Sequence, residues 1–318
     1  MNIFRRVLRW LFILGGFAAG LIAVIAAVFA KRLISPLRQP LWGTPADLDV
    51  PYESVAFPAA DGVRLSGWFV PAPTDSPRQG ATLVLVHGWG WNRLGEAATD
   101  ALANLTAASQ VDLLRLAHSL HNDGFGLLLY DSRNHGESGS QPPVQFGEAE
   151  AKDLLGALAY LHGRPEVAPN RIGVIGFSAG ANAVLYTLPQ TNQIQAAIVV
   201  QPTSPAHFAS RFAAHLLGPL GKAVMPLTEL IYRQAGGRPF KEYRPGTAAA
   251  QAGRTPVLYI QGRGDPWGSP EDVTQMAAAT PNVSGPLLVE TTDRYGGYQY
   301  LIDNPAIATA FFEQHLPE

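Results

Sequence analysis

The sequence contains no cysteine, so the chain has no disulfide bond, no thiolate metal site and no cysteine nucleophile. Charged residues are also scarce, at 15% of 318 residues, whereas 47% are apolar. This composition excludes an intrinsically disordered chain, which combines few apolar residues with many charges. Metal-ligand spacing such as HExxH is absent, as is a phosphate-binding P-loop. The sequence therefore predicts neither a metal nor another cofactor.

The few charges are unevenly distributed along the chain. Residues 1–40 contain six basic residues and no acidic residue, whereas residues 41–318 contain 17 basic and 25 acidic residues. Nucleic-acid binding requires lysine and arginine clustered on the folded domain. An acidic body does not meet that requirement, so we expect no nucleic-acid partner.

An uncharged apolar run of 21 residues occupies positions 10–30. A helix rises ~1.5 Å per residue, so this run spans the ~30 Å of a bilayer core. A cleaved signal peptide is the alternative, although secretory apolar regions are usually ~7–15 residues long. We predict a membrane anchor over residues 1–34, with a transmembrane helix at about 10–30, and a proline-rich linker over 35–50. Basic residues flank both ends of the run, which leaves the side of the membrane undetermined.

The remaining chain alternates between strand-like and helix-like segments. Two β-rich runs come first and are separated by the turn signal Asp61-Gly62. Later runs are short and apolar, as in strands buried on both faces, and helical periodicity appears between them. This alternation predicts an α/β protein with a mostly parallel sheet covered on both faces. The predicted strands are residues 52–58, 63–70, 82–86, 126–130, 171–175, 196–200, 256–260 and 286–289; the predicted helices are 148–161, 305–316 and two pieces within 97–120.

The motif with the clearest chemical meaning is GFSAG at residues 176–180. GxSxG between a strand and a helix is typical of a nucleophile elbow, a sharp turn that holds a serine clear of the backbone. The dipole of the following helix favours negative charge at this point. A dinucleotide-binding loop is the alternative, but it requires GxGxxG, a spacing that Gly173, Gly176 and Gly180 lack. We therefore predict Ser178 as a nucleophile.

Three more segments, together with this elbow, resemble the α/β-hydrolase superfamily: HGWG at 87–90, DSRNHGESG at 131–139 and QGRGDP at 261–266. The resemblance covers about residues 50–318 and is closest to membrane-anchored bacterial serine hydrolases. It implies the α/β-hydrolase fold over residues 51–318, with a helical lid at about 203–253. It also implies hydrolysis of ester or related acyl bonds.

The resemblance assigns further roles at the same site. The backbone N–H groups of Trp89 and Ala179 would form the oxyanion hole, and Asp265 would be the acid of a catalytic triad. His87 would be a structural turn residue. The lid contains apolar stretches at 208–217 and 220–231, which either favour an apolar acyl or aromatic substrate or form a small core of the lid itself.

The sequence departs from this family at the catalytic base. The family pattern HxGxY falls on residues 294–298, so the histidine position holds Arg294, or Tyr295 if the alignment shifts by one. Arginine stays protonated at neutral pH and the pKa of tyrosine is ~10, so neither is a ready base. His207, in the expected lid, and His135, in the loop after the fourth strand, are candidate substitute bases. The alternatives to a hydrolase are a non-catalytic binding or scaffold protein with the same fold and, as a third class, a hydride-transfer enzyme.

Overall fold

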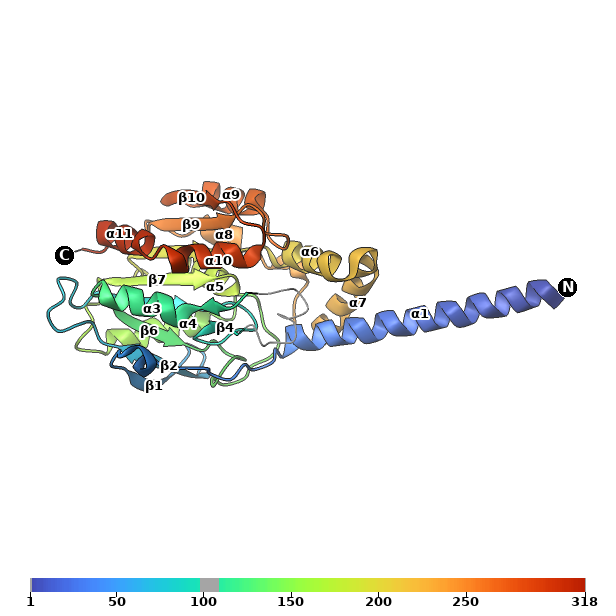
Figure 1. Cartoon of the computed structure of the whole chain (residues 1–318), viewed down its shortest axis with the longest axis horizontal. Coiled ribbons are helices and arrows are strands. Elements are labelled where there is room, and N and C mark those ends of the chain that lie inside the picture. The colour runs from blue at the N-terminus through green and yellow to red at the C-terminus, as the bar shows by residue number, and fades with distance from the viewer. Residues whose placement is uncertain (1, 98–108, 318) are drawn as a thin grey trace.

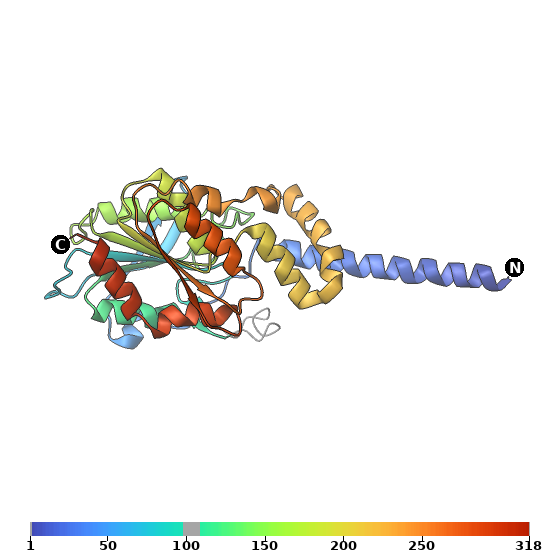
Figure 2. The ribbon, with the colours of Figure 1, turned by 90° about the horizontal axis from the view of Figure 1, so that it is seen from above.

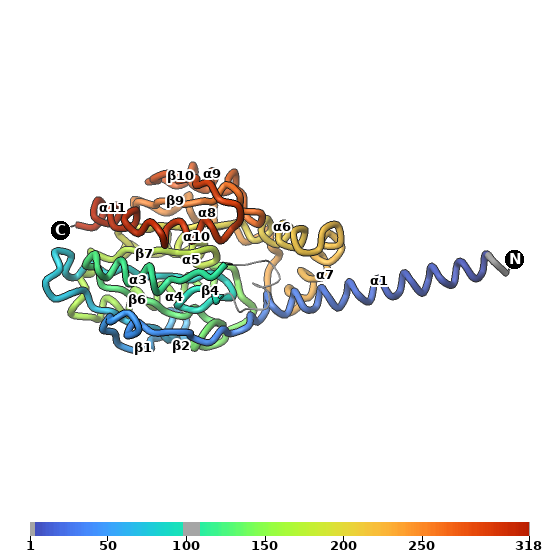
Figure 3. The backbone as a smooth tube through the Cα atoms, viewed as in Figure 1, coloured from blue at the N-terminus to red at the C-terminus, as the bar shows by residue number. Residues whose placement is uncertain are grey.

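The computed structural model of the protein describes residues 2–97 and 109–317 (Figure 1). A long helix, α1 (Asn2–Ile34), projects from an α/β body, and the C-terminus lies at the opposite end of that body (Figure 3). The helical segment Phe4–Ile34 has a mean hydropathy of 2.6 in its most apolar stretch. Among the described residues, this is the one helix that is long enough and apolar enough to cross a membrane.

An eight-stranded sheet forms the centre of the body. Its strand order is β1-β2-β6-β3-β7-β8-β9-β10. The pairs β1–β2 and β2–β6 are antiparallel, and the other neighbours are parallel. The prediction of a mostly parallel sheet is therefore confirmed. The strands are Glu53–Pro58 (β1), Arg64–Val70 (β2), Thr82–Val86 (β3), Gly126–Tyr130 (β6), Ile172–Phe177 (β7), Ala196–Val200 (β8), Val257–Gly262 (β9) and Val283–Val289 (β10), and a separate ribbon pairs Gly95–Glu96 (β4) with Val111–Asp112 (β5).

Helices cover both faces of the sheet (Figure 2). Successive side chains of a strand point to opposite faces, so Leu83 and Leu85 belong to one apolar cluster and Val84 and Val86 to another. The first cluster includes residues of α3 (Leu113–Asn122), α10 (Arg294–Asp303) and α11 (Ala306–His315). The second includes residues of α4 (Ala151–His162), α5 (Ala179–Thr187), α8 (Pro245–Ala249) and α9 (Pro270–Ala279).

Between β8 and β9 the chain leaves the sheet and forms α6 (Pro205–Leu217) and α7 (Gly221–Gln234). These helices lie in the segment for which the sequence predicts a lid, at the end of the body from which α1 projects (Figure 1). Helix α7 packs beside the last turns of α1, where Ala26 and Ala30 are fully buried. Thr228 Oγ1 donates a hydrogen bond to the carbonyl oxygen of Ala26 at 3.4 Å.

The proline-rich segment 35–50 is attached to the body. The Arg38 guanidinium donates to the carbonyl oxygens of Gly136 and Ser138, both at 2.6 Å, and to that of His135 at 3.2 Å. Gln39 is buried and its side-chain amide donates to the Gly90 carbonyl at 2.8 Å. The segment therefore fixes the position at which α1 leaves the body.

Several helices differ from the sequence expectation, and α8 and α9 were not predicted. Within residues 97–120, where two helical pieces are predicted, the described helix is α3, and residues 98–108 lie outside the described residues. Helix α10 was not predicted, and it begins at Arg294. Asp293 caps this helix by accepting a hydrogen bond from Gly296 N at 2.8 Å.

Candidate active site

Ser178 occupies the sharp turn between β7 and α5. Its backbone has φ 54° and ψ −117°, a conformation that is strained for a residue with a side chain. Its N–H donates to the Val200 carbonyl on the neighbouring strand at 2.9 Å. Position 180, two residues later, has room only for glycine, because a Cβ at Gly180 would lie 2.3 Å from the Val86 carbonyl oxygen. The backbone thus crosses closely over the end of β3 and presents Ser178 there.

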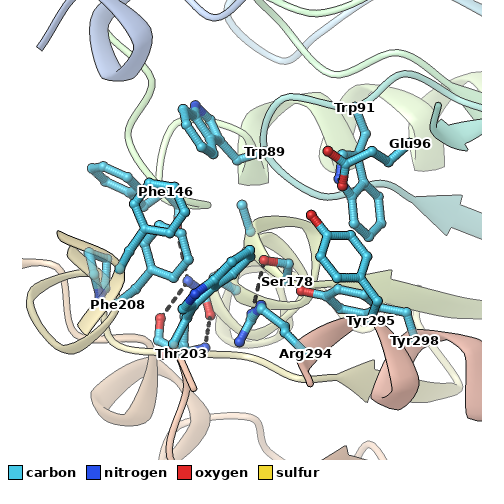
Figure 4. A pocket seen from close by; sticks show the side chains of 15 residues that line it. Trp89, Trp91, Glu96, Phe146, Ser178, Thr203, Phe208, Arg294, Tyr295 and Tyr298 are labelled. Atoms are coloured by element: carbon cyan, nitrogen blue, oxygen red, sulfur yellow. Dashed lines mark hydrogen bonds between the residues drawn. The ribbon is translucent and has the colours of Figure 1, made fainter. Parts of the chain in front are cut away.

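The Ser178 side chain faces a pocket at the sheet edge, with a volume of about 720 Å³ when its opening to solvent is included (Figure 4). Most of the lining is aromatic, which suits an apolar ligand better than a sugar or a phosphate. The aromatic lining comes from five separate parts of the chain: the β3–β4 turn, the β6–α4 loop, α6, the β9–α9 turn and α10. It includes Trp89, Trp91, Phe208, Trp267, Tyr295 and Tyr298.

Two residues that line the pocket with Ser178 have backbone N–H groups of chemical interest. They are Trp89, in the turn after β3, and Ala179, the first residue of α5. Neither N–H has a hydrogen-bond acceptor among the described residues. The first N–H groups of a helix have no partner within the helix, and they are suited to bind a carbonyl oxygen or an anion.

Arg294 lies between Ser178 and Asp265. Its Nη1 donates to the Asp265 carboxylate. Its Nη2 donates to Ser178 Oγ at 3.1 Å (Figure 4). The same Nη2 also donates to the Gln201 carbonyl at 2.9 Å. Arg294 and Asp265 are both buried, with exposed fractions of 2% and 3%. Burial is the largest single effect on the Arg294 guanidinium and lowers its pKa, but the charge of Asp265 and the interactions with Tyr298 together raise the pKa of Arg294 above its ordinary value. The group beside Ser178 is therefore a permanent hydrogen-bond donor that cannot accept a proton.

Asp265 has its hydrogen-bonding capacity filled without a histidine. Its Oδ1 accepts from the backbone N–H groups of Trp267 and Gly268, each at 2.9 Å, and its Oδ2 accepts from Arg294. The structure thus brings Ser178, Asp265 and Arg294 together.

The tyrosines of α10 line the same pocket. Burial raises the pKa of Tyr298 to about 12, although the Arg294 charge and a hydrogen bond to Ser178 act in the opposite direction. The Tyr298 hydroxyl is consequently protonated at neutral pH. Tyr295 is buried to an exposed fraction of 7% and packs against Tyr298, with ring centroids 6.3 Å apart.

The two candidate substitute bases lie elsewhere. His135 uses both ring nitrogens, because Nδ1 lies 2.8 Å from the Arg133 carbonyl and Nε2 accepts from Gly90 N at 3.1 Å. Burial, with a smaller effect of His87, lowers the pKa of His135 to about 3, so the ring is neutral. His207 lies on α6, and its Nε2 is buried without a hydrogen-bond partner in the described structure. No described histidine lines the Ser178 pocket.

Sequence reasoning missed several residues of this pocket. Glu96, on the two-residue strand β4, is a carboxylate in the lining and accepts from Trp91 Nε1 at 2.6 Å. Thr203 and Trp267 also line the pocket. A two-residue strand and isolated loop positions have no periodic pattern, so no signal in the single sequence could have found them. In the described part of the chain, no group of three or more histidine or acidic residues is arranged to hold a metal ion.

The fold is that of the alpha/beta hydrolase family. The sequence profile of that family matches residues 83–317, and the chain belongs to it. The chain is 30% identical over 186 residues to the uncharacterised protein YfhR of Salmonella typhi. The aligned region is 57% of this chain and 54% of YfhR. The chain therefore spans about half the length of the curated relatives it matches.

Two further proteins are informative neighbours. The thiohydrolase aneE of Aspergillus aculeatus is 27% identical over 135 residues, 42% of this chain and 36% of aneE. The solved structure of the Pyrococcus furiosus esterase Pf2001 superposes with a TM-score of 0.67 at 25% identity and covers 90% of this chain and 99% of the esterase. Family membership and these neighbours support a hydrolase.

Proposed function

We propose that this protein is a membrane-tethered serine hydrolase of ester or related acyl bonds, with Ser178 as the nucleophile. The observation that carries the proposal is the strained backbone of Ser178 at the edge of an aromatic pocket. Such a conformation costs about 1–3 kcal/mol and persists only where the surrounding structure imposes it, most often at functional sites. Helix α1 supplies the tether in this proposal.

The proposed mechanism follows from the groups around Ser178. The substrate carbonyl lies beside Ser178 Oγ, and its oxygen accepts hydrogen bonds from the N–H groups of Trp89 and Ala179. These donors stabilise the negative charge that develops when Oγ attacks the carbonyl carbon. The apolar part of the substrate occupies the aromatic pocket. The bond to the leaving group then breaks, and the departing alkoxide or thiolate takes a proton from water. Water then hydrolyses the acyl-serine, which releases the acid and restores the Ser178 hydroxyl.

The hydroxyl proton of Ser178 needs an acceptor, and Arg294, which stands where the family has a histidine base, cannot accept it. A guanidinium has no lone pair to receive the proton, but its hydrogen bond to Oγ stabilises the oxygen once the proton has left. Hydroxide from solvent then takes the proton and becomes water. This route predicts slow acylation that accelerates with rising pH, because the hydroxide concentration rises.

A second candidate function is non-catalytic binding of a carboxylate or carbonyl compound. The observation that favours it is the hydrogen-bond donors around Oγ: Arg294 and the N–H groups of Trp89 and Ala179. A set of donors binds an oxygen acceptor well, whereas the loss of the triad base typically lowers turnover by several powers of ten. Asp265 then serves to hold Arg294 in place.

Covalent labelling of the full-length protein in phospholipid nanodiscs distinguishes these two functions. A fluorescent fluorophosphonate forms an Oγ–phosphorus bond and releases fluoride only where a serine is reactive. We expect labelling that strengthens between pH 7 and pH 10, disappears in Ser178→Ala and persists in Ser210→Ala, a change at an exposed serine of α6. A folded protein that stays unlabelled across this pH range would contradict the hydrolase proposal and favour the binding protein.

A further inference from the structure

A second cavity, of about 500 Å³ with its opening to solvent included, lies between α1 and the helices α6 and α7. Apart from Arg32, apolar side chains form its walls, so it offers little to a polar ligand, which would lose its hydrogen bonds to water on entering. An alkyl chain suits it, because each buried methylene contributes ~0.8 kcal/mol. Its walls include Val28, Phe29 and Leu33 of α1, Ala209 and Phe212 of α6, and Met225 of α7.

This cavity adjoins the Ser178 pocket. Trp89, Phe146, Phe208 and Phe212 line both spaces. The rings of Phe208 and Phe212 are stacked with centroids 5.3 Å apart, and the Trp89 ring lies 6.5 Å from that of Phe208. A single layer of aromatic side chains therefore separates the membrane-helix cavity from the serine.

The depth of the cavity follows from the length of the apolar run. About 20 residues are needed to cross the hydrocarbon core, so the whole run 10–30 is required. The last residues of this run are not free in the structure, because Ala26 and Ala30 are buried against the body and Val28 and Phe29 line the cavity. When the run crosses a bilayer, these residues reach the level of the lipid acyl chains, and the cavity reaches that level with them.

The turn between α6 and α7 and the residue Arg32 agree with this placement. The turn, residues 216–220 (LLGPL), is apolar and extends alongside α1 on the side away from the sheet (Figure 1). Arg32 is a charged residue of the cavity lining and follows the apolar run by two positions. Arginine at the end of a membrane helix lies where the lipid headgroups lie.

We propose that the cavity is the entry site for a long, single acyl chain that moves from the bilayer towards Ser178. This inference rests on the proposed function, whose substrate class it narrows to membrane-dissolved compounds with a long acyl chain. The chain lies along Phe29 and Phe212, passes the shared aromatic layer, and brings its carbonyl group to the Ser178 pocket. Short-chain esters reach the same serine from solvent without using the cavity.

Photo-crosslinking in vesicles tests the cavity directly. Full-length protein in phosphatidylcholine vesicles receives palmitic acid with a diazirine in its chain, and mass spectrometry locates the adducts. We expect adducts in the last turns of α1 and in α6, and competition by unlabelled palmitate. Ala209→Phe fills the cavity from a position outside the Ser178 pocket. The displacement of about two methylenes should lower crosslinking about tenfold. Ala214→Phe, on an exposed side of the same helix, is the matched control.

The outcomes separate this inference from the proposed function. Reaction of Ser178 with a short ethyl fluorophosphonate reports on the hydrolase, and palmitate crosslinking reports on the cavity. Crosslinking that Ser178→Ala retains and Ala209→Phe loses supports the acyl site even if the serine is inert. If palmitate fails to crosslink, or crosslinks equally in Ala209→Phe, the acyl-site inference is overturned. Labelling of Ser178 by the fluorophosphonate would still support the proposed hydrolase function in that case. If Ala209→Phe loses its helical circular dichroism, Met225→Trp fills the same cavity from α7.

Discussion

Arg294 combines a structural interaction with a chemical one. Its guanidinium neutralises buried Asp265 and also contacts Ser178 Oγ at 3.1 Å. Asp265 retains two backbone N–H donors, but these do not carry a full positive charge. The stability of the fold at this edge of the sheet therefore depends on the same side chain that limits the chemistry of the serine.

Replacement of Arg294 by methionine should destabilise the protein by about 3–5 kcal/mol, because it leaves the Asp265 charge buried without a partner. The double variant Asp265→Asn/Arg294→Met removes both charges and should recover most of that loss. Urea unfolding of the full chain in nanodiscs, followed by tryptophan fluorescence, measures both variants. Equal stabilities of the single variant and the unchanged protein would show that the ion pair contributes nothing to folding.

At the scale of elements, sequence patterns identified the sheet well and the site only in part. The buried strands are short apolar runs bounded by turn residues, so the sequence pattern predicted them. The strand–turn–helix context predicted the turn at which Ser178 lies, and its role as a nucleophile stays a prediction. Helix α10 was not predicted because its first half contains Gly296 and Gly297, which are poor helix formers. Tertiary contacts of α10 determine it, and they also place Arg294 beside Asp265, a residue 29 positions earlier.

The loop after β6 depends on a neutral His135. The ring joins this loop to the turn after β3 through Gly90 N and the Arg133 carbonyl. An ordinary histidine has a pKa of ~6.5, so the unfolded chain binds a proton below that pH. The folded protein does not protonate His135 until about pH 3, because burial disfavours the charged ring.

The contribution of His135 to stability should consequently be present above pH 6.5 and fall as the pH drops from 6.5 towards 3, since the unfolded state binds its proton in that window. His135→Gln should show a shallower decline, although burial also lowers the pKa of His87 and preserves part of it. Thermal unfolding at a series of pH values measures both proteins. Parallel declines would exclude His135 as a source of the acid sensitivity.

At the scale of the whole molecule, α1 is both an apolar helix and a part of the body. Its first turns are exposed along apolar side chains such as Phe12 and Phe17, as a bilayer requires. Its last turns bury Ala26 and Ala30 and carry one wall of the second cavity. The composition of residues 1–34 predicted the apolar helix. The packing of its last turns against the body depends on α7, some 200 residues later, so no pattern within residues 1–34 could predict it.

Removal of α1 should therefore loosen α6 and α7 while leaving the sheet intact. We expect a chain that begins at residue 36 to be cleaved by trypsin at exposed Lys222 at least ~10 times faster than one that begins at residue 22, because burial of a side chain such as Leu33 contributes ~1.5–3 kcal/mol against local opening. Cleavage at exposed Lys152, on α4, should be equal in the two chains and serves as the internal control. Both are compared in the same detergent by mass spectrometry of the early fragments. Equal cleavage rates at Lys222 in the two chains would show that α6 and α7 keep their structure without α1.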